Sequence, residues 1–262
     1  MRKKIKIPSK VFMVLLMIFF YLPIIYTIVF SFNGTKSLTH WGGFSLQWYS
    51  KMFASREMTQ AIWYTVSIAV LATVISTIVG TITAIGLSKC GKILRAVVER
   101  VNDLPILNPE IVTAIGLLMF FSATGIKKGY ITMLLAHVTF CIPYVMLSVM
   151  PKLRSLDPNL ADAALDLGAT PWQALTKVIV PQIMPGIVSG VLIAFTMSID
   201  DFVISYFVTG NGVSNISILV YTMSKRVNPS INALSTVMIV IITAVLLVIN
   251  IVPMIKERKM KK

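Results

Sequence analysis

Six long apolar stretches restrict the fold of this chain more than any other feature. Each approaches or exceeds the roughly 20 residues that a helix needs to cross about 30 Å of hydrocarbon. They cover residues 11–32, 62–87, 106–123, 130–150, 183–208 and 233–255. Because 56% of the 262 residues are hydrophobic and only 13% are charged, little polar surface remains for a water-soluble globule of this size. The sequence therefore predicts an all-α membrane protein with six transmembrane helices.

Basic residues are unevenly distributed between the loops that join these spans. Seventeen of the 24 lysines and arginines flank the spans on one side, which includes both ends of the chain. These are Arg2, Lys3, Lys4, Lys6, Lys10, Lys89, Lys92, Arg95, Arg100, Lys152, Arg154, Lys177, Lys256, Arg258, Lys259, Lys261 and Lys262. Because basic residues accumulate on the cytoplasmic side, both termini are predicted to be cytoplasmic. The net charge of +14 then reflects membrane topology and gives no reason to expect nucleic-acid binding.

The predicted outer loop after the first span contains an aromatic-rich segment, residues 42–53. Phe44, Trp48, Tyr49 and Phe53 recur in it near helical spacing, among polar residues. Aromatic rings of this kind prefer the membrane–water interface. We expect a short helix that lies at the outer interface, and interfacial anchoring is favoured over direct contact with a ligand.

A predicted cytoplasmic segment, residues 154–181, has strong helix-boundary signals. Asp157 followed by Pro158 is typical of a helix start, and Gly168 is suited to end that helix in a left-handed conformation. Thr170 and Gln173 then have the spacing of a capping box. The segment is predicted to form two short helices with a glycine corner, either an ordinary surface element or a docking element.

Nothing in the sequence marks a second domain, so residues 1–262 are expected to form a single transmembrane domain.

The predicted cytoplasmic segment carries a resemblance to a known family. The stretch DAALDLGATPWQALTKVIVP, residues 162–181, resembles the E-A-A-x3-G-x9-I-x-L-P loop of the membrane subunits of ABC importers. The matching positions are Asp162, Ala163, Ala164, Gly168, Val178, Val180 and Pro181. Asp162 replaces the usual glutamate, and two valines replace isoleucine and leucine. The stretch FTMSIDDFVISYFVTG, residues 195–210, is similar to the second permease subunit of spermidine/putrescine importers.

The resemblance implies a type I ABC importer (MetI-like) permease fold and a division of labour. The chain is expected to form half of a translocation path for polyamines, paired with a second permease subunit in a heterodimer. Two ATPase subunits would hold ATP and Mg²⁺, and an extracellular polyamine-binding protein would deliver substrate. The coupling loop to the ATPase would include Asp162, Ala163, Ala164, Gly168 and Pro181. The chain itself is expected to have no catalytic residue, metal or cofactor.

The residues themselves leave two other transport functions open. One is an ABC permease for another small solute. The other is a proton-coupled secondary transporter, in which Asp200 or Asp201 would carry the proton. Against the second stand the six-span length, the lack of a visible inverted repeat and the loop at 162–181. The glycine- and lysine-containing stretch at 86–93 lacks the Ser or Thr of a P-loop and ends a predicted membrane helix, so we expect no ATP site there.

The fifth span contains two adjacent acids inside an apolar run. In a continuous helix Ser198, Asp201 and Ser205 would share one face, and Thr196 and Asp200 a neighbouring one. A carboxylate lowers the barrier for an amine in a passage of low dielectric constant. We therefore expect Asp201 to line the path with Asp200 as its support. The alternative is that both acids pair with basic groups or backbone amides.

Three other polar residues lie in or beside predicted spans. Glu110 follows Pro109 at the interrupted start of the third span and is, with Ser198, Asp200, Asp201 and Ser205, a candidate residue of the translocation path. It is expected either to satisfy freed backbone amides or to help close a gate. His137 and Tyr144 lie seven residues apart in the fourth span. Packing with a satisfied hydrogen bond is favoured over path lining for both.

Overall fold

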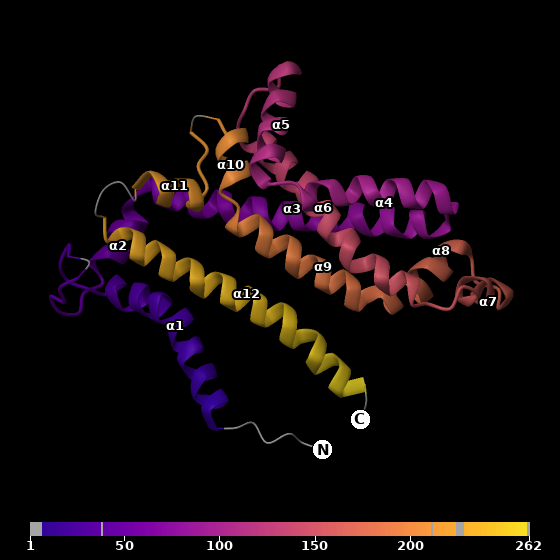
Figure 1. Cartoon of the computed structure of the whole chain (residues 1–262), viewed down its shortest axis with the longest axis horizontal. Helices are drawn as coiled ribbons and strands as arrows, with labels where there is room; N and C mark the ends of the chain where they lie inside the picture. Colours follow the sequence, from indigo (N-terminus) through magenta and orange to yellow (C-terminus); the bar gives the residue numbers. More distant parts are fainter. Residues whose placement is uncertain (1–6, 38, 211, 224–227, 261–262) are drawn as a thin grey trace. The chain divides into compact units, whose positions relative to one another are not determined.

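The computed structural model describes residues 7–37, 39–210, 212–223 and 228–260 (Figure 1). These residues form helices and connecting loops, with an isolated antiparallel bridge between Asn33 and Phe44, so the all-α prediction is confirmed. By internal contacts the chain divides into two compact units, residues 1–59 with 219–262, and residues 60–218. That residues 1–262 act as a single domain stays a prediction. Several of the seventeen basic residues used for topology lie outside the described residues: Arg2, Lys3, Lys4, Lys6, Lys261 and Lys262.

In its described residues the first unit contains three whole helices, parts of α3 (Arg56–Lys89) and α11 (Ile216–Met223), and a folded loop. The whole helices are α1 (Ile7–Ser31), α2 (Gln47–Ala54) and α12 (Ser230–Met260), and α12 packs against both of the others. In the loop, Asn33 is buried, donates to the carbonyls of Ser37 and His40, and accepts from the amide of Gly42. A buried amide with both ends paired fixes the path of the surrounding loop.

The aromatic outer segment forms the predicted helix α2, but its aromatic residues do not all lie at the surface. Trp48 is buried, and its Nε1 donates to the carbonyl of Asn33 at 2.6 Å. Phe44 and Phe53 are exposed, as an interfacial anchor requires. Interfacial anchoring was therefore the wrong expectation for Trp48, because its indole N–H found a backbone acceptor inside the unit.

The second unit contains most of the candidate membrane spans and the helices between them. They are α3 (Arg56–Lys89), which begins at the end of the first unit, α4 (Lys92–Leu107), α5 (Glu110–Ala123), α6 (Tyr130–Arg154), α9 (Val180–Asp200) and α10 (Val203–Val208). Between α6 and α9 lie α7 (Leu160–Asp166), α8 (Pro171–Gln173) and the π-helix η1 (Ala174–Ile179), and α11 (Ile216–Met223) starts at the unit's end.

Helices α6 and α9 run side by side and form the core of this unit (Figure 1). Small residues permit the close approach. A Cβ on Gly186 would lie 2.9 Å from the Ser148 carbonyl oxygen, and one on Gly190 would lie 3.3 Å from Val145 Cα. Small residues four apart, continued by the buried Ala194, are a common means of packing membrane helices, since lipid tails give no hydrophobic driving force between them.

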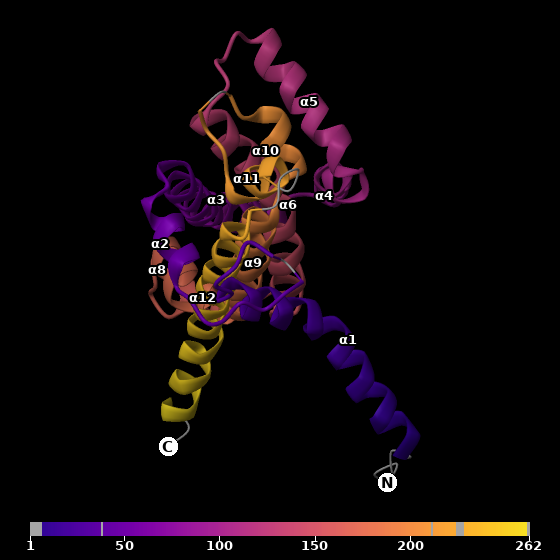
Figure 2. The same ribbon diagram turned by 90° about the vertical axis from the view of Figure 1, so that its left-hand side faces the viewer.

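The third predicted span differs from a simple helix. Residues 106–123 fall on the end of α4 and on α5, and these two helices are bent by 106° at Asn108 and Pro109 (Figure 2). Pro105 lies inside α4, and Pro109 directly precedes α5. Five helices in the described part of the chain are long and apolar enough to span a membrane, or up to six if the bent pair counts as one.

The fifth predicted span, residues 183–208, is also not one helix. It divides into α9 and α10, with a break at Asp201 and Phe202. At its other end it is longer than expected, because α8, η1 and α9 form one helical run from Pro171 to Asp200. The second short helix predicted in the cytoplasmic segment is therefore the start of this membrane helix.

Candidate functional site

The break between α9 and α10 is organised by the carboxylate of Asp201. The backbone of Asp201 is extended (φ −62°, ψ 124°), which ends α9. Its Oδ1 accepts the amide of Ile204 at 3.2 Å, and its Oδ2 accepts both the amide and the hydroxyl of Ser205 at 2.7 Å. Asp201 thus caps the six-residue helix α10 and satisfies amides that have no partner within that helix.

His137 joins this cap to two helices. Its Nδ1 lies 2.7 Å from Ser198 Oγ on α9, and its Nε2 lies 2.9 Å from Ser205 Oγ on α10. The same Nε2 is 3.5 Å from Asp201 Oδ2. His137 comes from the first third of α6 and is only 1% exposed. The favoured prediction for His137, packing with satisfied hydrogen bonds, is confirmed.

The bonding pattern assigns the ring protons of His137. With Asp201 as a carboxylate, the Ser205 hydroxyl proton points to Asp201, because a carboxylate only accepts. Ser205 Oγ is then left as an acceptor toward His137, so Nε2 carries a proton. In a neutral ring Nδ1 accepts the hydroxyl proton of Ser198. The chain of bonds from Ser198 to Asp201 therefore has one consistent direction.

Asn215 closes the network from the segment before α11. Its side-chain amide donates to the Asp201 carbonyl at 3.0 Å and to Ser205 Oγ at 2.9 Å. Its Oδ1 accepts the amide of Ile218 and so caps the start of α11. One buried side chain fixes two helix ends.

The two adjacent acids therefore have different surroundings. Asp201 is 8% exposed with every carboxylate oxygen bonded, whereas Asp200 is exposed at the last residue of α9. No hydrogen bond or ion pair of the Asp200 carboxylate is seen in the part of the chain that the structure describes. The burial of Asp201 disagrees with the expectation that Asp201 lines the path with Asp200 as its support, and its bonds to backbone amides fit the alternative stated for this residue. Ser198 and Ser205 are likewise buried beside Asp201, not on an open face.

The other predicted path residue, Glu110, is the first residue of α5 and is exposed. A carboxylate in the first turn interacts favourably with the helix dipole. Among the described residues, no backbone amide donates to it, so the expectation that it satisfies freed amides has no support in this geometry. Its role stays a prediction.

The residues of the predicted coupling loop form the corner that the sequence predicts. Gly168 has φ +86°, the left-handed region that glycine adopts without strain. Thr170 and Gln173 form the predicted capping box, with the Thr170 hydroxyl accepting the Gln173 amide and the Gln173 side chain accepting the Thr170 amide. Helix α7 starts at Leu160, later than the Asp157–Pro158 signal, because Asp157 instead accepts the amide of Asn159. Asp162 and Ala163 on α7 are exposed.

Pro181 lies just after the π-helix η1. Proline has no N–H, and its ring clashes with the carbonyl four residues before it in a regular α-helix. The wider turns of η1, in which the amide of Val180 bonds to the carbonyl of Leu175, end directly before this proline. The position of Pro181 thus gives a physical reason for a π-helix. Such helices are rare, and those that occur often lie at functional sites.

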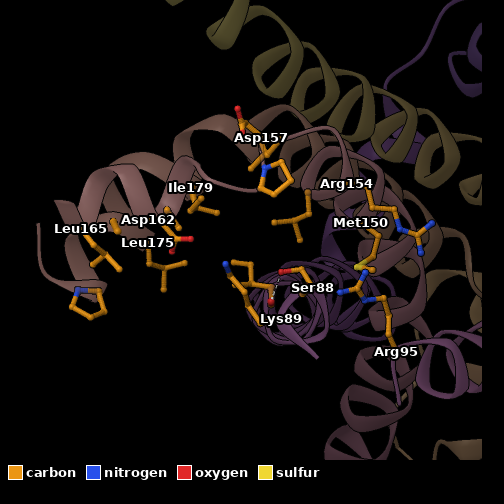
Figure 3. Close-up of a pocket in the computed structure, with 17 residues that line it drawn as sticks. Ser88, Lys89, Arg95, Met150, Arg154, Asp157, Asp162, Leu165, Leu175 and Ile179 are labelled. Carbon is orange, nitrogen blue, oxygen red and sulfur yellow. Dashed lines mark hydrogen bonds between the residues drawn. The ribbon is translucent and has the colours of Figure 1, made fainter. Parts of the chain in front are cut away.

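A cavity of about 590 Å³ separates α7 from the ends of α3 and α6 (Figure 3). Lys89 at the end of α3 and Asp162 on α7 both line it, and no ion pair within 4.0 Å joins them in the described residues. Arg95 lies at its edge and donates to the carbonyls of Leu87, Ser88 and Cys90. The stretch at 86–93 is therefore a helix C-terminus capped by a guanidinium, and not the strand–loop–helix of a P-loop.

Comparison with known proteins identifies the family. Residues 76–262 match the model of the binding-protein-dependent transport system inner membrane component. The chain belongs to this family. It is thus the membrane component of a transport system, and several of its helices are long enough to cross the membrane.

Curated permeases of this kind are similar to the chain over most of its length. The spermidine/putrescine transport system permease protein PotC of Haemophilus influenzae is 37% identical over 242 residues, which cover 92% of this chain and 94% of that protein. The putrescine transport system permease protein PotI of Escherichia coli K12 is 37% identical over 229 residues, which cover 84% and 82%.

Solved structures confirm the fold. A chain in the crystal structure of a bacterial ABC transporter involved in the import of the acidic polysaccharide alginate has a TM-score of 0.70, with 96% of this chain and 93% of that chain covered. A chain in the crystal structure of an amino acid ABC transporter with histidines has a TM-score of 0.57 and covers 81% and 98%. Both chains are only 16% identical to this one, so the likeness concerns the fold alone, which is that of a type I ABC importer permease.

For this inner membrane component, sequence reasoning missed Asn215 and undervalued His137. Asn215 lies in a loop 14 residues from Asp201, and no periodicity relates the two. The available signal was a histidine in the middle of an apolar span, since a polar residue at that depth needs a partner.

Proposed function

We propose that this chain is a permease subunit of an ATP-driven importer of polyamines and forms half of the translocation path. The observation that carries the proposal is the 37% identity over 92% of the chain to a permease named for spermidine and putrescine. The exposed carboxylate of Asp200 at the end of a membrane helix supports it, because polyamines are cationic and a carboxylate stabilises a cation in a low-dielectric passage.

Within the path, Asp200 faces the substrate and Asp201 holds the end of α9 in place through the buried cap. Ser198 and Ser205 act with Asp201, since both bond to His137 in the same network. Glu110 lies at the bend between α4 and α5, where an exposed acid is available to a passing amine. A permease site of this kind binds weakly, so that substrate is released.

The partners are a second permease subunit, two ATPase subunits that bind ATP and Mg²⁺, and an extracellular polyamine-binding protein. The coupling loop contributes Asp162, Ala163, Ala164 and Gly168, and Pro181 lies at its junction with α9. Two apolar side chains of this loop support a docking role: Leu167 is 89% exposed and Trp172 is 71% exposed. Exposed apolar groups on a capped, rigid corner are typical of a protein interface.

Both termini are cytoplasmic in this proposal. The basic residues of the described part agree with it, because Lys89, Arg95 and Lys152 cluster near the same helix ends as the coupling loop. ATP hydrolysis then occurs below that face, in the partner subunits and not in this chain.

The test has two steps. The chain, purified in mild detergent, is expected to bring with it a second permease and an ATPase. The reconstituted complex with its binding protein is then expected to take up labelled spermidine when ATP is supplied, and to stop when ATP is depleted and a proton gradient is maintained. Uptake driven by the gradient alone would identify a secondary transporter instead. If the complex takes up another solute but no polyamine, the family assignment stays valid and the proposal of a polyamine substrate is wrong.

A further inference from the structure

One face of α9 carries polar residues along its whole length. Gln182, Ser189, Thr196 and Asp200 are all exposed, and their spacing of seven, seven and four residues places them within one narrow arc of the helix. We call these four residues the α9 polar stripe. An adjoining side of α9 carries Gly186, Gly190 and Ala194, which pack toward α6 or are buried.

The stripe residues keep hydrogen-bond acceptors available. Ser189 and Thr196 donate their hydroxyl protons to the carbonyls of Pro185 and Leu192, four residues back on the same helix, at 2.9 and 2.8 Å. Their oxygens can still accept a bond from a donor outside the helix. Among the described residues no partner is seen for the side chains of Gln182 and Asp200. All four groups thus present oxygen to an approaching N–H donor.

Such a stripe is poorly suited to lipid. A helix face that meets hydrocarbon carries apolar side chains, and a carboxylate there is costly. The exposed Met184, on the other side of α9, is an example of a residue that suits lipid. The stripe therefore faces either water or another protein chain.

We propose that the α9 polar stripe lines the translocation path and receives the ammonium groups of a linear polyamine in succession. This inference rests on the function proposed above and adds Gln182, Ser189 and Thr196 to its path. In that orientation Gln182 lies toward the coupling loop and Asp200 toward the outer side. An ammonium group passes from the carboxylate of Asp200 to neutral oxygens, which bind it more weakly and let it move on.

The spacing of the stripe fits the chemistry of this substrate class. Four helical residues rise about 6 Å and seven rise about 10.5 Å. Five extended single bonds, the separation of the two nitrogens in a 1,4-diaminobutane unit, span about 6 Å. Nine such bonds, as between the terminal nitrogens of spermidine, span about 11 Å. One end of the molecule can therefore bind a new oxygen before the other end leaves its own.

The test is cysteine labelling in the assembled transporter. Cys90 and Cys141 are first replaced by serine and alanine. Ser189→Cys and Thr196→Cys are then probed with a small cationic thiol reagent, with and without spermidine and in the nucleotide-free and nucleotide-bound complexes. Met184→Cys is the matched control, because Met184 is also exposed on α9 but points away from the stripe. We expect labelling at 189 and 196 that spermidine slows at least several-fold, and no such protection at 184.

Each outcome separates the stripe from the proposed function. If the complex transports spermidine but positions 189 and 196 stay unlabelled in every nucleotide state, or are labelled without protection, the stripe is not in the path. If single changes at these positions disrupt assembly, the stripe is a subunit interface and the inference fails. If the unmodified complex transports no polyamine, the proposed function fails, and labelling at 189 and 196 without polyamine still decides whether the stripe faces water.

Discussion

Helix α9 is interrupted at both ends, and the two interruptions have different physical origins. At Asp201 the helix ends, and a buried network of side chains from α6, α10 and the segment before α11 holds the two helix ends in place. At Ala174–Ile179 the helix widens into π turns beside Pro181, and the adjoining corner is held by local bonds between exposed residues. The first end depends on tertiary contacts and the second on local sequence.

This difference indicates which end is fixed and which can be remodelled. Buried, fully bonded polar groups strengthen one another and resist rearrangement. Capping bonds between exposed residues are worth about 1 kcal/mol each and are the kind that open locally. We therefore expect changes at the Asp201 end to affect assembly, and changes at the loop end to affect coupling.

The largest expected effect is that of Asp201→Ala. It removes the acceptor of the Ile204 and Ser205 amides and leaves His137 Nε2 without its charged neighbour. A buried donor left without its acceptor costs about 1–3 kcal/mol, and this change affects several donors at once. The yield and thermal stability of the purified complex should fall strongly. A stable complex with Asp201→Ala would mean that the network does not hold the break.

Gly168→Val should come next and should act at the other end. A β-branched residue at φ +86° is strained by about 1–2 kcal/mol or more, so the corner between α7 and α8 is expected to shift. ATP hydrolysis by the complex should then lose its coupling to uptake, which we expect to fall about tenfold. Gly168→Asn is the matched control, because asparagine tolerates the left-handed region, and it should retain most of the uptake. Equal uptake in both variants would remove the corner from the coupling mechanism.

Asp200→Asn should have a more limited effect, since this side chain is exposed and has no partner in the described residues. Assembly and thermal stability should stay at the level of the unmodified complex. Spermidine uptake should fall several-fold, equivalent to about 1 kcal/mol of lost stabilisation of the moving cation. Asp201→Asn is the comparison variant. If Asp201→Asn lowers uptake without affecting assembly, and Asp200→Asn lowers assembly, the two acids have the opposite roles.

The smallest effect is expected from Thr170→Val. It removes the hydroxyl that accepts the Gln173 amide, a bond between exposed residues. Loss of such a cap costs about 1 kcal/mol of local helix stability. Hydrogen exchange of the amides at 171–174 should speed up about fivefold, with little change in the melting temperature of the complex. Thr170→Ser keeps the hydroxyl and should restore slow exchange; a global loss of stability would show that the corner is not a local structure.

The sequence by itself determined the features that depend on neighbouring residues or on length. Apolar runs of sufficient length predicted membrane helices because backbone amides must be bonded within the helix in hydrocarbon. Gly168 and the Thr170–Gln173 capping box were predicted because turns and caps are decided within a few residues. The loop motif also pointed to the family that the comparisons identify.

Only the tertiary structure decided where the helices break and which acid is buried. Helical periodicity placed Asp201 and Ser205 on one face of a continuous helix, but the helix ends before Asp201. It ends there because His137 and Asn215 supply hydrogen-bond partners for the interrupted backbone and for the side chains beside it. These two residues lie 64 positions before Asp201 and 14 after it. Nothing in the adjacent residues distinguishes Asp200 from Asp201. Their difference comes from packing against α6, and contacts between segments so far apart have no period that a sequence can reveal.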